Sequence, residues 1–132
     1  MPHIVKIGLA VMRNGRVLLA RKRGLELCIL PGGKPETGES DEAALVREID
    51  EELGCGIETG SLTHLGDFTD RAAGKPDTLV TVRLYAGRLV GEPVPRNEIE
   101  GLVWLGPEDA VGGPVKVAPS LERQILPFLF RR

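Results

Sequence analysis

Five segments of the chain have the apolar content and the alternation of apolar and polar residues that are typical of β-strands. They are residues 4–12, 16–22, 62–69, 78–90 and 102–105. Asn14-Gly15 is a strong hairpin signal between the first two segments. Residues 26–30 form another short apolar run, and we expect the chain to leave any sheet at Pro31-Gly32-Gly33, which follows it.

Between Ser40 and Leu53 the pattern changes to that of a helix. Ser40 is placed to cap the first turn, and the carboxylates of Asp41 and Glu42 suit the positive end of the helix dipole. Gly54 is a natural stop, because glycine readily adopts the left-handed conformation that ends many helices. The segment therefore predicts a helix of about four turns.

The C-terminal part of the chain contains two further helical signals. Pro107 predicts the start of a short helical turn over residues 108–111. Ser120 predicts the cap of a helix over residues 120–130, and we expect Pro127 to kink or end that helix because it lacks a backbone donor. The apolar face of this helix consists of Leu121, Ile125, Leu126 and Leu129. Together the elements indicate an α+β fold, with both helices packed on a mainly antiparallel or mixed sheet.

Length and composition are those of a single globular domain, which we expect to span residues 1–132. With 42% hydrophobic and 27% charged residues the chain is not of a disordered type, and no apolar run is long enough to cross a membrane. A net charge of −2 argues against binding to nucleic acid polymers, which generally requires a basic face. Cys28 and Cys55 lie among apolar neighbours, so we expect two buried thiols, as suits a reducing cytoplasm.

Three carboxylates of the predicted helix fall on one side of it. With Glu48 at zero and about 100° per residue, Glu51 lies at about −60° and Glu52 at about +40°. A separate apolar stripe, at about 100° to 160° on the same scale, is expected to face the sheet. It consists of Val46, Ile49 and Leu53. Carboxylates this close repel one another, so a group of opposite charge is expected to offset the repulsion.

A divalent cation is one such group, because Mg²⁺ and Mn²⁺ prefer carboxylate oxygen ligands. Arg47 is another, and a solvated acidic surface without any ligand is the plainer alternative. The preceding loop favours the cation, because Pro31-Gly32-Gly33 lets the backbone approach a ligand closely and Lys34 is placed to meet phosphate. Pro-Gly-Gly alone is typical of an ordinary turn, so the prediction depends on the loop and the helix in this order.

Residues 33–55 resemble the signature of the Nudix hydrolase family in its compact, MutT-like form. That signature is a Gly, five residues, a Glu, seven residues, and then Arg-Glu-apolar-x-Glu-Glu-x-Gly-apolar. The matching positions are Gly33, Glu39, Arg47, Glu48, Ile49, Glu51, Glu52 and Gly54. Cys55 stands at the final apolar position, a mild departure that a small buried thiol can fill. The resemblance implies a Nudix fold, an α/β/α sandwich in which the signature helix and a C-terminal helix pack on a mixed sheet.

The resemblance also implies a role for each signature residue. Glu48 and Glu52 would ligate Mg²⁺, with Mn²⁺ as an alternative ion, and Glu51 would bind it directly or through water. The carbonyl of Gly32 matches the backbone ligand that MutT-like members use. Three residues would hold loop and helix together: Gly33, Glu39 and Gly54. Arg47 would act in catalysis by orienting the carboxylates.

The general base stays open between residues inside and outside the signature. Glu48 is the first choice, although metal ligation and base action compete for the same oxygens. Some members of the family use a Glu outside the signature, and Glu98 is the leading candidate of that kind, ahead of Glu100. A solvated loop carboxylate is the alternative for both.

Cations before and within the signature are candidate phosphate contacts. They are Arg21, Lys22, Arg23 and Lys34. Strand alternation places Arg21 and Arg23 on one face and Lys22 on the other, so not all of them can serve, and an exposed basic edge is the alternative for at least one. We select Arg21, Arg23 and Lys34 as the substrate-binding set.

Recognition of a base is weakly indicated. Phe68, Tyr85 and Trp104 could stack on one, but single aromatic residues in strands more often belong to the core. The segment around Ser120 lacks the Asn that oxidised-guanine enzymes of the MutT-like group use near the terminal helix. His64 has no partner motif and is interpreted as structural.

The resemblance implies hydrolysis of a diphosphate linkage in a nucleoside diphosphate derivative. The preferred substrate is a (deoxy)nucleoside triphosphate or an oxidised nucleotide, giving nucleoside monophosphate and diphosphate. The alternatives are ADP-ribose, a nucleotide sugar or a dinucleoside polyphosphate, although the marks of those groups are mostly missing. A nucleotide-binding module without activity is disfavoured, because such modules usually lose signature carboxylates that this chain keeps. The sequence leaves monomer and homodimer open.

Overall fold

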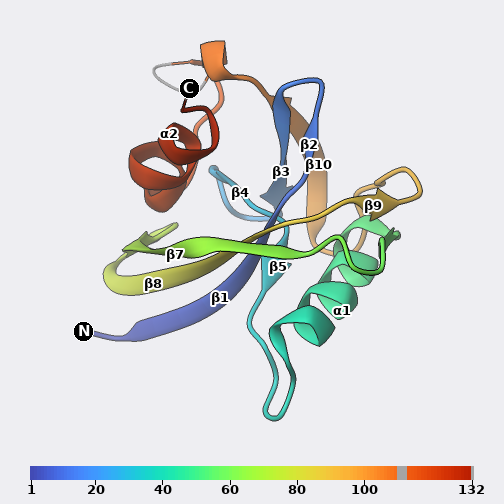
Figure 1. The fold of residues 1–132 in the computed structure, drawn as a ribbon. Helices are drawn as coiled ribbons and strands as arrows, with labels where there is room; N and C mark the ends of the chain where they lie inside the picture. Colours follow the sequence, from blue (N-terminus) through green and yellow to red (C-terminus); the bar gives the residue numbers. More distant parts are fainter. Residues whose placement is uncertain (110–112, 132) are drawn as a thin grey trace.

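A computed structural model describes residues 1–109 and 113–131, and its two main sheets lie between a helix on one side and a helix on the other (Figure 1). The first sheet has the order β5 (Gly32–Gly33), β1 (His3–Ala10), β8 (Lys75–Ala86), β7 (Thr63–Ala72). The second has the order β10 (Ile99–Leu105), β3 (Arg16–Lys22), β2 (Met12–Arg13), with β4 (Cys28–Ile29) also paired to β3. A two-stranded pair joins β6 (Gly56–Ile57) to β9 (Leu89–Val90). β1 and β8 are parallel and the other described strand pairs are antiparallel, so the predicted mixed sheet is confirmed.

Helix α1 (Asp41–Leu53) begins and ends where the sequence predicts. The side chain of Ser40 accepts a hydrogen bond from the Ala43 N–H at 3.1 Å. Gly54 adopts a φ of 65°, in the left-handed region, and its N–H donates to the Asp50 carbonyl at 3.0 Å. Each end of the helix therefore has a capping hydrogen bond made by the residue beside it.

Alternation along β3 divides the core between the two helices. Leu18 points to a cluster that contains the buried residues of α1, whereas Val17 and Leu19 point to a cluster that contains the C-terminal helix. Strand residues one apart face opposite sides of a sheet, so a single strand supplies both layers. The α+β sandwich that the sequence predicts is confirmed.

Several strand predictions need correction. The segment 4–12 breaks at Val11 into β1 and β2, and the segment 78–90 is two strands, β8 and β9. The expectation that the chain leaves the sheet at Pro31-Gly32-Gly33 is wrong, because Gly32 and Gly33 pair with Gly8 and Ile7 of β1. Glycines are tolerated there because β5 is a two-residue strand at the edge of the sheet.

The predicted apolar stripe of α1 is wrong at one position. Val46 is 44% exposed, whereas Ala44 and Leu45 are fully buried. On the helical wheel these two lie at about −40° and about +60°, so they bracket the positions of Glu48 and Glu52. The carboxylates therefore lie within the arc that faces the sheet, where the side-chain-free backbone of β5 leaves room for them.

The C-terminal helix also differs from prediction. Ser120 is helical, with φ −63° and ψ −35°, and its side chain makes no capping bond. The helical stretch begins at Pro119, a favourable first position, so the capping prediction is wrong. It consists of the π-helical turn η2 (Leu121–Ile125) and α2 (Leu126–Leu129). Pro127 lies in the first turn of α2 and does not end the helix, because the ladder changes from π to α just before it.

The short 3-10 turn η1 (Pro107–Asp109) confirms the start of the turn predicted after Pro107. The remainder of that prediction, up to residue 111, lies outside the described residues. Among the helices that the structure describes, none is long and apolar enough to cross a membrane.

The corrected helix face yields a stability prediction. Leu45→Ala should lower the free energy of unfolding by about 2–5 kcal/mol, because it leaves a cavity in a fully buried site. Val46→Ala, one residue along, should change it by less than about 1 kcal/mol, because that side chain is 44% exposed. Chemical denaturation of both variants would measure the two values. Equal losses would show that the orientation of α1 is wrong.

Candidate active site

The carboxylate of Glu48 lies against the backbone of Gly33, in space that only glycine leaves open. The Glu48 side chain is 16% exposed. A Cβ built at Gly33 would lie 1.7 Å from Glu48 Oε2, so any other residue here would displace the carboxylate. Gly32 is constrained separately, because its φ is 140° and a Cβ there would lie 2.0 Å from the Ile7 carbonyl oxygen. The glycine pair thus brings sheet and helix into contact at this point.

Glu52 lies one helical turn beyond Glu48 and reaches the same strand. Its Oε1 accepts a hydrogen bond from the Gly32 N–H at 3.1 Å. Burial is the main cause that raises the pKa of Glu52 to about 7, and the charges of Glu48 and Glu98 add to it. The Gly32 N–H and Lys22 act in the opposite direction. In the absence of a metal, Glu52 is therefore close to half-protonated at neutral pH.

Burial also raises the pKa of Glu48. The guanidinium of Arg47 opposes this, whereas the neighbouring Glu51 and Glu98 raise the pKa further. Glu51 and Glu98 are more open, with side chains 51% and 59% exposed. The charges of four carboxylates from α1 and the segment before β10 therefore act on one another, and two of the four, Glu48 and Glu52, are partly desolvated.

This donor set suits a hard divalent cation. Carboxylate oxygens are the ligands that Mg²⁺ and Mn²⁺ prefer, and a cation would offset the burial and the repulsion that raise the pKa values of Glu48 and Glu52. Within residues 1–109 and 113–131, no three Asp, Glu, His or Cys side chains are already gathered closely enough to hold an ion. Binding of an ion would therefore require the carboxylates to move closer together.

Arg47 connects the helix to the loop that precedes it. Its Nε and Nη2 donate to the two carboxylate oxygens of Glu39, both at 2.8 Å, and Nη2 also donates to the Lys34 carbonyl at 3.1 Å. This hydrogen bonding is the main cause that lowers the pKa of Glu39 to about 2. Arg47 Nη1 lies 3.3 Å from Glu48 Oε1, so one guanidinium joins the loop, the helix and a site carboxylate.

The end of α1 is closed by the segment that carries Glu98. Three donors of this segment reach the last carbonyls of the helix: Val94 N–H to Leu53 at 2.9 Å, Arg96 N–H to Glu52 at 3.0 Å, and Asn97 Nδ2 to Glu51 at 2.7 Å. Asn97 has a φ of 54°, in the left-handed region that Asn tolerates better than most residues. The helix end therefore fixes the backbone immediately before Glu98.

Glu98 is the carboxylate outside the signature that reaches the cluster. Its carbonyl accepts from the Arg23 N–H at 2.7 Å, and its Oε2 lies 3.6 Å from Lys22 Nζ. Its charge acts on both Glu48 and Glu52. Glu100 pairs instead with Arg21, whose Nη1 donates to it at 2.8 Å.

The basic residues of β3 divide between the two faces as alternation requires. Lys22 shares a face with Leu18, which packs in the α1 cluster, and its charge acts on Glu52. Arg21 lies on the opposite face in its pair with Glu100, in a separate shallow hollow. The guanidinium of Arg23 donates to the Asn97 carbonyl at 3.4 Å. Of the candidate phosphate contacts in and just after β3, Lys22 lies beside the carboxylates, whereas Arg21 and Arg23 were predicted.

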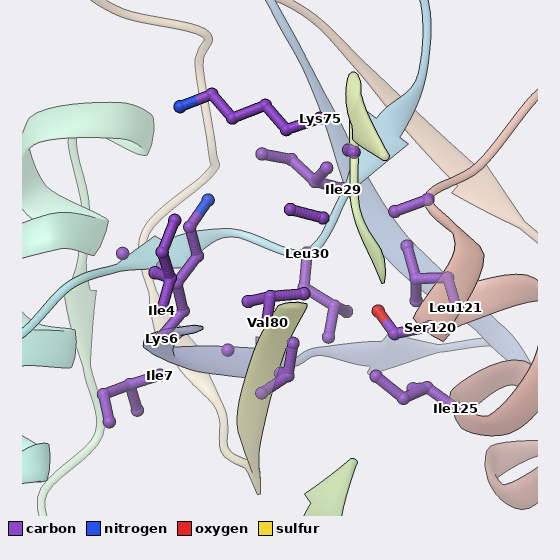
Figure 2. A pocket seen from close by; sticks show the side chains of 17 residues that line it. Ile4, Lys6, Ile7, Ile29, Leu30, Lys75, Val80, Ser120, Leu121 and Ile125 are labelled. Carbon is purple, nitrogen blue, oxygen red and sulfur yellow. The ribbon is translucent and has the colours of Figure 1, made fainter. Parts of the chain in front are cut away.

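An apolar cavity of about 110 Å³ opens beside the glycine pair (Figure 2). Gly32 and Gly33 form part of its wall, so it adjoins the carboxylates that contact them. Its apolar lining includes Ile4, Ile29, Leu30, Val80, Val82, Leu121 and Ile125. The polar side chains in its lining are those of Lys6, Lys75 and Ser120, none of which is among the predicted site residues. The sequence contains one indication of a special role for Lys6, because it is a charged residue in the middle of a half-buried strand.

The aromatic side chains do not line this cavity. Tyr85 donates to Asp41 Oδ2 at 2.6 Å and stacks on His64 with ring centroids 4.9 Å apart. Trp104 lies under the guanidinium of Arg13 at 4.7 Å, and Phe68 packs against the C-terminal helix cluster. These positions agree with structural roles for the aromatic residues and for His64.

The family model of the NUDIX domain matches residues 2–129 of the chain. The chain belongs to the Nudix family. A CTP pyrophosphohydrolase from Escherichia coli (strain K12) is 30% identical over 130 residues, which cover 92% of this chain and 91% of that protein. A protein from Mycobacterium tuberculosis, named provisionally as 8-oxo-dGTP diphosphatase 2, is 39% identical over 103 residues, covering 73% of this chain and 68% of its own. The crystal structure of a MutT NUDIX hydrolase from Burkholderia pseudomallei matches with a TM-score of 0.67 and 31% identity, over 88% of this chain and 92% of that one.

These relationships confirm the resemblance drawn from the signature and the MutT-like form of the fold. As a Nudix hydrolase, the chain acts on pyrophosphate bonds. Nudix hydrolases generally use divalent metal ions, which agrees with the chemistry of the carboxylate cluster.

The raised pKa of Glu52 predicts how stability depends on pH. Because its pKa in the folded chain, about 7, exceeds the ordinary value of 4.5, the unfolded chain loses this proton first. Stability without metal should therefore fall as pH rises from 4.5 through about 7. Glu52→Gln cannot ionise, so with a chelator present its Tm should exceed that of the wild type at pH 8 by roughly 5 °C.

Thermal unfolding at several pH values, with chelator or with Mn²⁺, would test this. Near pH 4.5 the two proteins should unfold at similar temperatures, and Mn²⁺ at pH 8 should raise the Tm of the wild type more than that of Glu52→Gln. A metal-free Glu52→Gln variant that is less stable than the wild type at pH 8 would contradict the assigned environment of Glu52.

Because Asn97 caps α1 and directly precedes Glu98, its substitution should lower kcat as well as stability. Asn97→Ala removes a hydrogen bond and strains a left-handed residue, so it should displace Glu98 and lower kcat roughly tenfold with a smaller change in KM. Asn14→Ala is the matched control, because Asn14 has a φ of 53° in the β2–β3 turn. Both variants should lose stability, but only Asn97→Ala should lose kcat. Equal kcat values in the two variants would remove Asn97 from the positioning of Glu98.

Proposed function

We propose that this chain is a Mg²⁺-dependent hydrolase of nucleoside triphosphates, in their ribo-, deoxy- or oxidised forms, that releases nucleoside monophosphate and diphosphate. The observation that carries the proposal is that Glu48 and Glu52 contact the Gly32-Gly33 strand within range of the charge of Glu98, and that this strand also forms part of the wall of an apolar cavity. A ligand with an apolar ring at one end and a metal-bound diphosphate at the other suits this combination.

The chain's own residues divide the work between binding and proton transfer. Glu48 and Glu52 would hold Mg²⁺ or Mn²⁺, with Glu51 bound directly or through water and the Gly32 carbonyl as a backbone ligand. The bound metal would neutralise the diphosphate and acidify a coordinated water. Arg47 would keep the carboxylate of Glu48 oriented through its 3.3 Å contact.

Glu98 is the general base that the geometry supports better than Glu48. Glu48 is largely buried against Gly33 and would be committed to the metal, whereas the Glu98 side chain is 59% exposed at the open side of the cluster. A carboxylate that is free of metal ligation can accept the proton of the attacking water. Lys22, 3.6 Å from Glu98, would then meet the phosphate beside it.

The names of two relatives support a triphosphate substrate, because CTP and 8-oxo-dGTP both carry one. Among the described residues that line the cavity, none contributes a carboxylate or carboxamide side chain that could read the edge of a base. We therefore expect broad tolerance of the base. ADP-ribose, nucleotide sugars and dinucleoside polyphosphates are the alternative substrates.

The setting that we propose is a reducing cytoplasm, because Cys28 and Cys55 are both unpaired and buried. The partner is a small-molecule nucleotide rather than a nucleic acid polymer or a membrane. We expect a monomer or a homodimer.

The test is a panel of CTP, dNTPs, 8-oxo-dGTP, ADP-ribose, nucleotide sugars and dinucleoside polyphosphates, each with Mg²⁺, with Mn²⁺ and with a chelator. Phosphate, diphosphate and nucleoside monophosphate would be measured as products. Glu52→Gln should lower turnover at least ~100-fold. Glu42→Gln is the matched control, because Glu42 lies on the same helix but is exposed and away from the cluster.

Hydrolysis of triphosphates above the other substrates, lost with chelator and in Glu52→Gln but kept in Glu42→Gln, is the expected result. If the enzyme prefers ADP-ribose or a nucleotide sugar, the proposed hydrolase activity stands but the proposed triphosphate substrate is wrong. No metal-dependent product from any compound in the panel would overturn the proposed activity.

A further inference from the structure

Four of the five lysines of the chain lie close enough for their charges to interact. The chain's lysines are Lys6, Lys22, Lys34, Lys75 and Lys116. The charges of Lys22, Lys34 and Lys75 all act on Lys6, which comes from the middle of β1. These residues belong to β1, β3, the loop after β5 and the start of β8, so segments far apart in sequence bring the charges together.

Most of these lysines have no acidic partner. Within residues 1–109 and 113–131, Lys22 pairs with Glu98, but Lys6, Lys34 and Lys75 make no ion pair with a carboxylate. The arginines behave differently, since seven of them, Arg13, Arg16, Arg21, Arg47, Arg83, Arg88 and Arg123, pair with acids. Four described arginines, Arg23, Arg71, Arg96 and Arg131, also make no ion pair within this part of the chain, but no described arginine lines the cavity, whereas Lys6 and Lys75 do.

Lys6 is half-buried, and burial is the main cause that lowers its pKa, with the three other lysines adding to the effect. A desolvated ammonium group surrounded by like charges is unfavourable unless an anion approaches it. Lys6 feels the negative charge of Glu52 but does not form an ion pair with it. The group that would balance Lys6 is thus missing from the described residues of the protein itself.

Two of the lysines form part of the cavity wall. In Figure 2 the side chain of Lys75 extends toward the side on which α1 lies, and that of Lys6 rises from β1 beside Ile4 on the same side of the cavity. Lys6 lines the cavity together with Ile4 and Gly8, which share its face of β1. The two ammonium groups therefore lie at the edge of the apolar cavity nearest to the helix that carries the carboxylates.

We propose that Lys6 and Lys75, supported by Lys34, form an anion cradle that binds the oligophosphate of a nucleotide whose base occupies the adjoining cavity. The inference rests on the proposed function for the identity of the ligand, and it assigns substrate-binding residues that lie outside the signature. Lysine binds phosphate as a point charge with three donors, so two or three lysines can share the oxygens of one chain of phosphates.

An alternative is that the Lys6 stem only covers apolar surface while its ammonium reaches water. That explanation accounts for Lys6 alone. It does not account for Lys75 and Lys34 beside it, because like charges at one edge repel and would be better separated in the absence of an anion. A phosphate chain accounts for all three.

The experiment compares Lys6→Met, Lys75→Met and the double variant with Lys116→Met. Lys116 is exposed, lies outside the cavity and receives the same substitution, so it controls for the loss of one positive charge. Thermal unfolding would establish that each variant is folded. Two readouts follow: KM and kcat for the best nucleoside triphosphate with Mg²⁺, and calorimetric binding of inorganic tripolyphosphate and of a non-hydrolysable nucleoside triphosphate.

Each single variant at Lys6 or Lys75 should raise KM and weaken tripolyphosphate binding by roughly tenfold, with kcat nearly unchanged, and the double variant by roughly 100-fold. Lys75→Arg should retain most of the binding, and Lys116→Met should equal the wild type. The nucleotide should bind more tightly than tripolyphosphate, because only the nucleotide fills the cavity.

The two proposals fail in distinguishable ways. If the wild type hydrolyses nothing in the panel but binds tripolyphosphate through Lys6 and Lys75, the proposed activity is wrong and the anion cradle is supported. Hydrolysis with KM values and tripolyphosphate affinities that are the same in Lys6→Met, Lys75→Met and Lys116→Met would overturn the cradle. A wild type with no affinity for tripolyphosphate or for the non-hydrolysable nucleotide would also overturn it.

Discussion

The carboxylate of Glu48 occupies the space that a side chain at position 33 would need, and the arrangement of the site depends on this exclusion. Because Gly32 and Gly33 present only backbone to α1, the helix can turn Glu48 and Glu52 toward the sheet rather than toward water. Arg47 then ties the intervening loop to the helix through Glu39, with two bonds of 2.8 Å. Strand β5, the loop and α1 therefore act as one rigid unit that holds carboxylates at an edge of the sheet.

This packing has an electrostatic consequence. Burial raises the pKa values of Glu48 and Glu52, while like charges and burial lower that of Lys6. Glu52 and Lys6 thus lie near one another without forming an ion pair, and Glu48 has only Arg47 to balance it, which is unfavourable for the protein alone. A divalent cation bound to a phosphate chain supplies both missing partners at once, because the cation balances the carboxylates and the phosphates balance the lysines. The buried carboxylates and Lys6, which lower the stability of the free protein, would then stabilise its complex with the metal and the phosphates.

Much of the site could be predicted because its determinants are local. The bounds of α1 follow from Ser40 and Gly54, and the signature lies within a short stretch of chain whose spacing fixes which carboxylates are neighbours. A helical wheel gives relative angles but not the direction of the sheet, so Val46 was assigned to the core although it is 44% exposed.

Other site residues could not be predicted, because their positions depend on contacts between segments far apart in sequence. Lys6 and Lys75 line one cavity, although Lys6 lies opposite Val82 and not Lys75 in the pairing of β1 with β8. Their common position depends on how segments far apart in sequence associate, which leaves no mark in either segment alone.

The central claim is that partly protonated, buried carboxylates of α1 hold the metal. Calorimetric titration of the wild type with Mn²⁺ at pH 7, in two buffers of different ionisation enthalpy, measures both the affinity and the protons released on binding. Because the pKa of Glu52 is about 7 without metal, binding should release a substantial fraction of a proton per chain, and Glu52→Gln should lose most of both the affinity and the release. Absence of binding, or the same affinity and proton release in Glu52→Gln as in the wild type, would contradict the claim.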